Sequence, residues 1–151
     1  SNDVLTKYML IHYYTLDEVQ EQMDYYANHY KNKTGYYWLM QCIKTGAEIG
    51  VIGINNCSVV HKKAEIGFWS LPEFWNKGYT TEAGKAVLQF CFQSLQLNRI
   101  EATVETENTA SVAAIKKLGL QHEGTFKEYE INNGKPIDLM MFAILKNSGL
   151  Y

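Results

Sequence analysis

Arginine is almost absent from this sequence, since Arg99 is the only one among 14 basic residues. With 16 acidic residues the formal net charge is −2, so the chain has no basic surplus that would attract nucleic acid or an anionic membrane in general. No apolar run approaches the ~20 residues that a membrane-spanning helix needs, and we expect no signal peptide before the first helix. These absences exclude a general nucleic-acid binder and a membrane-spanning protein.

Cysteine is also scarce, with only Cys42, Cys57 and Cys91. An odd number of cysteines in apolar strand or helix contexts argues against a disulfide framework, so we expect three reduced core thiols in a cytoplasmic protein. The histidines do not have the spacing of metal ligands, and the sequence predicts no metal site. They are His12, His29, His61 and His122.

Apolar residues are what the sequence has in quantity, with 46% hydrophobic residues against 20% charged ones. This composition is typical of a globular protein rather than a disordered one. A chain of 151 residues can bury a sizeable core, so we expect a single domain over residues 1–151.

Hydrophobic periodicity and turn signals predict both strands and helices. In chain order we expect a helix from the capping box Thr15-Leu16-Asp17-Glu18 to about residue 32, strands at 36–43 and 49–54, a polar linkage at 55–63, a strand at 64–71, a helix after the turn at 76–82, a strand at 99–104, a helix at 109–118 that stops at Gly119, and strands at 121–131 and 136–145. Asn133-Gly134 is a strong β-hairpin signal between the last two strands. This order predicts an α+β domain, a mixed sheet with helices on its faces.

The turn Asn76-Lys77-Gly78-Tyr79-Thr80-Thr81-Glu82 connects an aromatic strand to a helix. The first backbone N–H groups of a helix have no partner inside it and lie at the positive end of its dipole, so they can bind an anion. Gly78 lets the backbone approach such a ligand, and Thr80 and Thr81 add hydroxyl donors. We interpret the turn as a pyrophosphate site, with a plain strand-to-helix connection as the alternative. It is neither a Walker loop nor a dinucleotide fingerprint, because it lacks the lysine–Ser/Thr pair and the three glycines that these need.

Five stretches keep a common order and spacing: Ala64-Glu65-Ile66-Gly67-Phe68-Trp69, Trp75-Asn76-Lys77-Gly78-Tyr79-Thr80-Thr81-Glu82-Ala83, Leu97-Asn98-Arg99-Ile100-Glu101-Ala102, Glu107-Asn108-Thr109-Ala110-Ser111, and Lys117-Leu118-Gly119-Leu120 with Glu123-Gly124-Thr125. Together they resemble the GNAT superfamily of acetyl-CoA-dependent N-acetyltransferases over residues 36–146. They are most similar to the branch that contains ribosomal-protein N-terminal (alanine/serine) acetyltransferases and spermidine acetyltransferases. The resemblance implies a mixed, largely antiparallel sheet with helices on both faces and a central splay between the strands that carry Glu65 and Glu105.

The resemblance further implies a site for acetyl-CoA as co-substrate, without a metal. The pantetheine arm would lie along Phe68, Trp69, Ser70 and Leu71, and the pyrophosphate would be held by Lys77, Gly78, Tyr79, Thr80 and Thr81. Asn108 would bond a pantetheine amide, and Ser111 would lie near the thioester sulfur. Glu130 falls where ribosomal-type relatives have a carboxylate suited to deprotonate the amine.

The implied reaction is acetyl transfer to a primary amine, either a protein N-terminus such as that of a ribosomal protein or a small molecule. A protonated amine cannot attack a thioester, so a carboxylate must take a proton, with Glu130 as the first candidate and Glu65 as the second. Ser111 is the candidate hydroxyl for assisting the leaving thiolate. We expect neither nucleic acid nor a membrane as a partner, and a homodimer stays open.

Several of these residues also have a simpler interpretation. Asn108 and Ser111 flank a helix start, where such residues most often cap, and Glu130 could be a solvated strand residue. The sequence departs from the family at three points, and two of them, Trp75 and the first strand, keep a second hypothesis open, a CoA-binding module without catalysis. Trp75 stands where the family has arginine or glutamine, and residues 111–118 lack the tyrosine that many members use as a general acid. The sequence is N-terminally short and starts too late to contain the first strand of the branch, so we expect either a truncated chain or another segment or subunit at that edge of the sheet.

Overall fold

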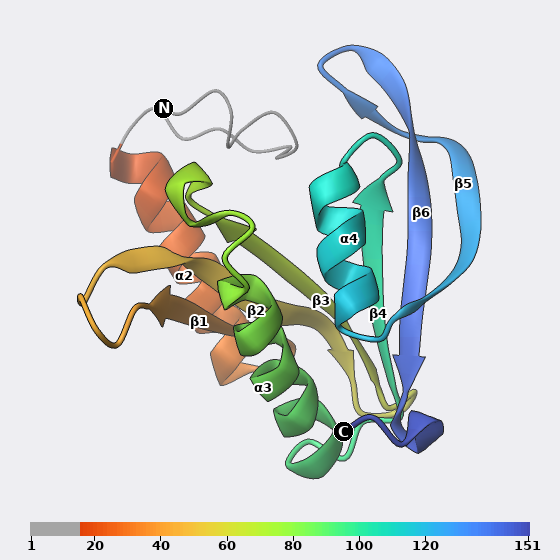
Figure 1. The fold of residues 1–151 in the computed structure, drawn as a ribbon, viewed down its shortest axis with the longest axis horizontal. Helices are drawn as coiled ribbons and strands as arrows, with labels where there is room; N and C mark the ends of the chain where they lie inside the picture. The colour runs from red at the N-terminus through yellow and green to blue at the C-terminus, as the bar shows by residue number, and fades with distance from the viewer. Residues whose placement is uncertain (1–15) are drawn as a thin grey trace.

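The structure is a computed structural model that describes residues 16–151 (Figure 1). Its elements are α2 (Leu16–Lys31), β1 (Tyr36–Gln41), β2 (Glu48–Ser58), β3 (Lys63–Ser70), the 3₁₀ helix η1 (Pro72–Phe74), α3 (Tyr79–Gln93), β4 (Arg99–Glu105), α4 (Thr109–Lys117), β5 (Gln121–Asn132), β6 (Lys135–Leu145) and the 3₁₀ helix η2 (Lys146–Ser148). The strands form one sheet in the order β1-β2-β3-β4-β6-β5. The predicted α+β fold, with a mixed and largely antiparallel sheet, is confirmed. The threonine of the predicted capping box lies outside the described residues.

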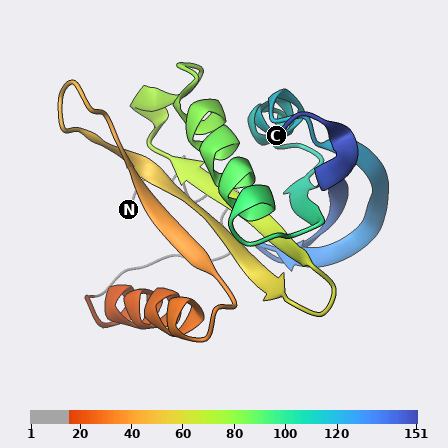
Figure 2. The ribbon, with the colours of Figure 1, turned by 90° about the horizontal axis from the view of Figure 1, so that it is seen from below.

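Successive side chains of β1 point to opposite faces of the sheet, and their contacts show which helices cover each face. Trp38 and Ile52 are register partners, and the Trp38 ring lies 5.5 Å from the ring of Phe90 on α3. Tyr37 points to the opposite face, where its ring lies 4.2 Å from the ring of Tyr26 on α2. Figure 2 shows the sheet between α2 on one side and α3 and α4 on the other. We call these two surfaces the α2 face and the α3/α4 face.

The core lies on the α3/α4 face, between the sheet and these two helices. Its largest fully buried side chains come from α3, from the strands and from the segment that follows α4: Phe92, Phe142, Ile52, Ile54, Leu88, Ile100, Leu118, Leu120 and Cys91. Gly84 lets α4 approach α3, because a Cβ at this position would lie 2.7 Å from the Leu118 side chain. Among the described residues, no helix is both long and apolar enough to span a bilayer.

The predicted polar linkage at residues 55–63 is partly wrong. β2 continues through Ser58, and β3 begins at Lys63. The pattern misled because the register shifts between Asn55 and Ser58, where Asn56 adopts a left-handed backbone with φ of 49°. Such a bulge interrupts the alternation of side chains and turns one of them toward a new direction.

β3 and β4 pair in parallel over three residues only, from Lys63–Arg99 to Glu65–Glu101. Beyond these pairs both strands continue, β3 to Ser70 and β4 to Glu105, without pairing to each other. Figure 1 shows them side by side at one end and diverging toward the other. The splay that the family resemblance implied is therefore present.

β5 and β6 form a long hairpin whose turn residues Asn133 and Gly134 both have positive φ, as the sequence predicted for this pair. One of its two register shifts lies between Phe126 and Glu130. Asp138 holds it by accepting a hydrogen bond from Lys127 Nζ at 2.6 Å and another from the Glu128 N–H at 2.9 Å. This bulge determines toward which face of the sheet the side chains at the end of β5 point.

Candidate active site

The start of α3 offers three unpaired backbone amides. The first helical hydrogen bond runs from the Glu82 N–H to the Gly78 carbonyl at 2.9 Å, so the N–H groups of Tyr79, Thr80 and Thr81 have no partner within the helix. Gly78 precedes them with φ of 85°, a left-handed conformation that glycine adopts without strain. A Cβ at Gly78 would meet no atom within 4 Å, so the turn faces open space.

A cavity of about 370 Å³ lies directly over these amides, on the α3/α4 face at the open end of the splay. It gathers most of the residues predicted to bind the co-substrate, and they come from β3, α3 and the start of α4: Phe68, Trp69, Ser70, Gly78, Tyr79, Thr80, Thr81, Asn108 and Ser111. Two predicted residues do not line it. Leu71 is one, and Lys77 is the other, since its Nζ lies over the Phe74 ring at 5.8 Å from the centroid.

Sequence reasoning missed one wall of this cavity, which belongs to α4. Ala110, Ala113, Ala114 and Lys117 recur there at helical spacing. The alanines keep the wall flat and Lys117 adds a positive charge at its far end. The recurrence of small residues along one side of the helix was the available signal, but it also fits a plain helix-packing face.

Trp75 braces the loop between β3 and α3. Its indole Nε1 donates a hydrogen bond to the Ser70 carbonyl at 2.8 Å, and its side chain lines the cavity. The position that departs from the family pattern is therefore part of the cavity wall.

Asn108 caps α4, since its Oδ1 accepts a hydrogen bond from the Ser111 N–H at 3.1 Å. The simpler interpretation of Asn108 is thus confirmed. Capping uses the side-chain oxygen only, so a contact with a ligand would come from Nδ2. Ser111 itself is half-buried and lines the cavity.

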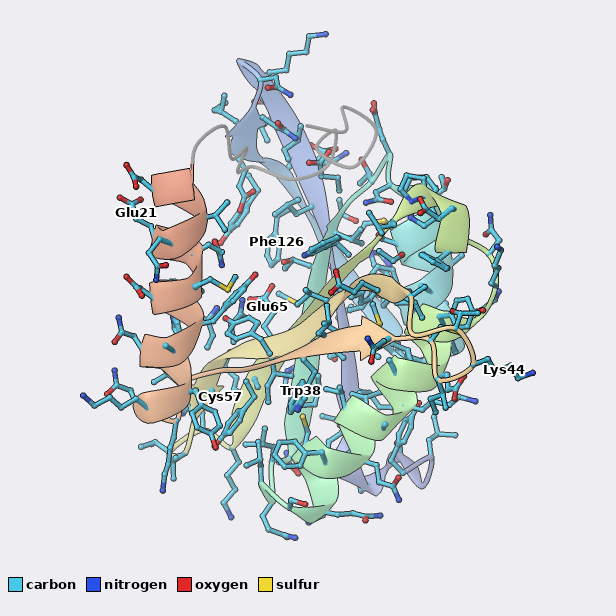
Figure 3. The ribbon with its side chains drawn as sticks, turned by 90° about the vertical axis from the view of Figure 1, so that its left-hand side faces the viewer. Glu21, Trp38, Lys44, Cys57, Glu65 and Phe126 are labelled. Atoms are coloured by element: carbon cyan, nitrogen blue, oxygen red, sulfur yellow. The ribbon has the colours of Figure 1, made fainter. Side chains whose placement is uncertain are left out.

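Glu65 lies on the other side of the sheet. Its neighbours Ala64 and Ile66 are buried in the core, so Glu65 points to the α2 face. Thr103 Oγ1 on β4 donates to one oxygen of the carboxylate at 2.6 Å, and Asn56 Nδ2 donates to the other at 3.2 Å. Figure 3 shows Glu65 in the space between α2 and the strands behind it, on the same side as Phe126.

Two more carboxylates, the predicted Glu130 and the unpredicted Glu105, share the α2 face. Glu105 is register partner to Leu139 and accepts a hydrogen bond from Asn132 Nδ2 at 2.7 Å. Glu130 lies two residues before Asn132 on the same strand, so both side chains point to one face. The structure therefore brings Glu65, Glu105 and Glu130 to one face of the sheet and the cavity to the other, with the splay between them.

A charge network closes the paired end of the splay. Glu101 accepts from Lys63 Nζ at 3.0 Å and from Arg99 Nε at 2.7 Å, and Arg99 also pairs with Glu123. Burial opposes ionisation of Glu101, yet the hydrogen bonds from Arg99 and Lys63 leave its pKa below the usual value. The hydrogen bond from Arg99 likewise lowers the pKa of Glu123.

A larger groove of about 850 Å³ lies between β1 and α3. Its lining is mostly aromatic and aliphatic, with Trp38 and Phe90 among its residues, and it contains none of the three carboxylates. No group of three His, Cys, Asp or Glu side chains that could hold a metal ion occurs within residues 16–151. We therefore place the candidate site at the splay.

Comparisons with known proteins agree with this geometry. A family model described as an acetyltransferase (GNAT) domain matches residues 1–121. The uncharacterized N-acetyltransferase YoaA of Bacillus subtilis is 34% identical over 147 residues, which are 97% of this chain and 83% of YoaA. The spermidine N(1)-acetyltransferase of Escherichia coli K12 is 25% identical over 130 residues, 86% of this chain and 69% of that protein. Two further Bacillus relatives are matched over only 58% and 55% of their own length.

Solved structures share the fold. The spermidine N-acetyltransferase of Vibrio cholerae in complex with CoA and spermine superposes with a TM-score of 0.83 at 24% identity, covering 96% of this chain and 84% of that one. A likeness at this identity shows the fold rather than a particular substrate.

Proposed function

The chain belongs to the GNAT acetyltransferase family and uses acetyl-CoA as its co-substrate, and we propose that it transfers the acetyl group to a primary amine by direct attack within a ternary complex. No covalent enzyme intermediate is needed, because a thioester and an amine held in the right geometry react with each other. One observation carries the proposal: the splay joins a cavity with three free amides on one face to carboxylates on the other.

The α3 turn would hold the pyrophosphate through the N–H groups of residues 79–81 and the hydroxyls of Thr80 and Thr81. The edge of β3 has no strand partner on the β4 side after Glu65, so its backbone groups can pair with the pantetheine amides. Asn108 would add its Nδ2 as a donor. Ser111, on the first turn of α4, would then lie near the sulfur.

The carboxylates supply the proton transfer that the amine requires. Glu130, with Glu65 as the second candidate, takes a proton from the ammonium group so that its nitrogen lone pair can bond to the thioester carbon. An unpaired N–H at the edge of β3 donates to the oxyanion that forms. When the carbon–sulfur bond breaks, the Ser111 hydroxyl assists by donating to the departing thiolate. The products are an acetamide and CoA.

The charge of the α2 face favours a small cationic amine as acceptor. Glu65, Glu105 and Glu130 would each attract an ammonium group, and a polyamine carries several such groups. The curated spermidine N(1)-acetyltransferase relative supports the same choice. A protein N-terminus, including a ribosomal one, is the competing acceptor.

The three cysteines are free thiols, which supports the predicted cytoplasmic setting.

Thiol release from acetyl-CoA tests this proposal. Spermidine, spermine, peptides with free N-termini and aminoglycosides should be compared in parallel, with mass spectrometry of the product. We expect the fastest release with polyamines. Release with peptides alone would show that the acceptor is a protein N-terminus rather than a polyamine. Binding of CoA without release for any amine would favour the non-catalytic module.

A further inference from the structure

Thr103 and Glu65 form the first side-chain contact beyond the paired part of the splay. Backbone pairing between β3 and β4 ends at Glu65 and Glu101, and Thr103 lies two residues further along β4. Its Oγ1 nevertheless reaches Glu65 Oε1 at 2.6 Å. A hydroxyl donating to a carboxylate makes a short, charge-assisted hydrogen bond of this length. The two strands are thus connected by side chains at the point where their backbones part.

The second oxygen of Glu65 is held from the opposite direction. Asn56 donates its Nδ2 to Oε2 at 3.2 Å from the bulge of β2, where its φ of 49° departs from strand geometry. Asparagine tolerates this left-handed conformation better than most residues. The bulge that sequence analysis mistook for a linkage therefore serves to aim a donor at Glu65.

Glu65 differs from the neighbouring glutamate in its partners. Glu101, its register partner on β4, is neutralised by Lys63 and Arg99, and Arg99 is shared with Glu123. Glu65 forms no ion pair with any described residue, and both donors that hold it are neutral. A carboxylate has about four lone-pair sites, so two remain for a further donor. A half-buried, oriented and unneutralised carboxylate is a binding group for a cation.

We infer that Thr103 and Asn56 are positioning residues that hold Glu65 to bind an ammonium group of the amine acceptor at the point where β3 and β4 separate. The inference rests on the proposed function, since it concerns the same site. Glu130 then takes the proton, whereas Glu65 orients a charged amine. Loss of either donor frees the carboxylate to rotate, which weakens acceptor binding and leaves the co-substrate cavity on the other face unchanged.

The experiment compares Thr103→Val, which keeps the shape and removes the hydroxyl, with Thr103→Ser, which keeps the hydroxyl. Thr125→Val on the exposed part of β5 is the matched control. A hydrogen bond to a charged group is worth roughly 10- to 100-fold, so Thr103→Val should raise the KM for spermidine by about 10-fold. The KM for acetyl-CoA should stay within about two-fold, and Thr103→Ser and Thr125→Val should resemble the wild type in both constants.

A double-mutant cycle separates positioning from a structural role. In a Glu65→Gln background, Thr103→Val should add little to the KM for spermidine, because the oriented charge is already gone. Equal losses in both backgrounds, or parallel increases in both KM values, would overturn the inference, as would an unchanged KM in Thr103→Val. Thermal unfolding of each variant identifies any that fail to fold, in which case Asn56→Gly, which removes the donor and tolerates the left-handed backbone, replaces it.

Calorimetric titration of spermidine keeps this test separate from the proposed function. If the wild type transfers no acetyl group to any amine, the proposed function fails. Weaker spermidine binding by Thr103→Val than by Thr103→Ser would still support the positioning role, and equal binding would refute it.

Discussion

Two carboxylates compete for the role of general base, and their surroundings differ. Glu65 is fixed by two neutral donors on β2 and β4, whereas Glu130 lies on β5, which holds Asn132 against Glu105. A fixed carboxylate suits binding, and one on a separate strand can approach an amine that Glu65 already holds. These separate roles, amine binding for Glu65 and proton transfer for Glu130, lead to a prediction for each residue.

Glu130→Gln keeps the size of the side chain but cannot accept the proton. We expect turnover at neutral pH to fall by about 10²-fold or more, with affinity for acetyl-CoA nearly unchanged. Part of the loss should return at higher pH, where more of the amine is already unprotonated. Steady-state kinetics between pH 7 and 10 measure this.

Glu65→Gln should act mainly through the KM for the amine. The assignment of Glu130 as the base fails if Glu65→Gln abolishes turnover while Glu130→Gln stays within a few-fold of wild type.

All three cysteines were predicted to be core thiols, but only Cys91 is fully buried, while Cys42 and Cys57 are partly exposed. Burial raises the pKa of Cys57 to about 11 and that of Cys91 to about 12, so both stay protonated near neutral pH. Cys42 is only partly covered, and hydrogen bonds from Thr45 and from the backbone lower its pKa. Because thiolate is the reactive form, Cys42 should be alkylated first.

Iodoacetamide labelling followed by peptide mass spectrometry measures this order. We expect Cys42 to be modified at least about 10-fold faster than either of the others at pH 7.5. Thr45→Val should slow its labelling, since it removes one of the hydrogen bonds that favour the thiolate. Faster labelling of Cys91 would show that the core opens more readily than its packing indicates.

At the scale of elements, local chemistry determined what sequence could predict. Positive φ at Asn133 and Gly134, the left-handed Gly119 and the free amides of α3 all follow from residue types at fixed offsets. The bulge at Asn56 did not, because polar residues in a strand and in a loop look alike without their partners. The splay could not be derived from alternation either. β3 keeps the same period before and after Glu65, and only the family resemblance pointed to the separation.

Gly78→Asp tests the anion site at the start of α3. The substitution adds a negative charge where the free amides should meet pyrophosphate, so CoA affinity should fall by about 10-fold or more. Gly78→Asn is the matched control, since it has the same size and tolerates the left-handed conformation without the charge. Titration of CoA against both variants provides the comparison. Equal CoA affinities in Gly78→Asp and the wild type would show that the pyrophosphate does not bind at this turn.

At the scale of the whole molecule, the network around Arg99 links β3, β4 and β5. Its partners Glu101 and Glu123 have folded-state pKa values below their ordinary ones. A carboxylate with a lowered folded pKa contributes stability above its unfolded pKa and loses that contribution as the pH falls through the folded value. The network therefore stabilises the fold at neutral pH and stops doing so in acid.

Arg99→Gln should lower the melting temperature at pH 7 and flatten the decline of stability between about pH 5 and pH 3. Thermal unfolding across this range, monitored by circular dichroism, measures both effects. Lys127→Gln, which removes the exposed pair with Asp138, is the control and should change the melting temperature much less. An unchanged acid slope in Arg99→Gln would assign the acid sensitivity to other carboxylates.

Co-substrate binding should stabilise the whole fold, because a ligand that binds only the native state raises stability by mass action. At about 100 times its Kd, a ligand adds roughly 2.7 kcal/mol, which for a chain of this size corresponds to a rise of several degrees in melting temperature. CoA and acetyl-CoA should produce this shift, whereas NAD and ATP at equal concentration should not, since neither carries the pantetheine arm that we propose pairs with β3. Gly78→Asp should lose most of the shift while Gly78→Asn keeps more of it, which ties the effect to the α3 turn. Absence of any CoA-dependent shift at millimolar ligand would contradict the assignment of the cavity, and an equal shift with ATP would reduce the site to a general phosphate binder.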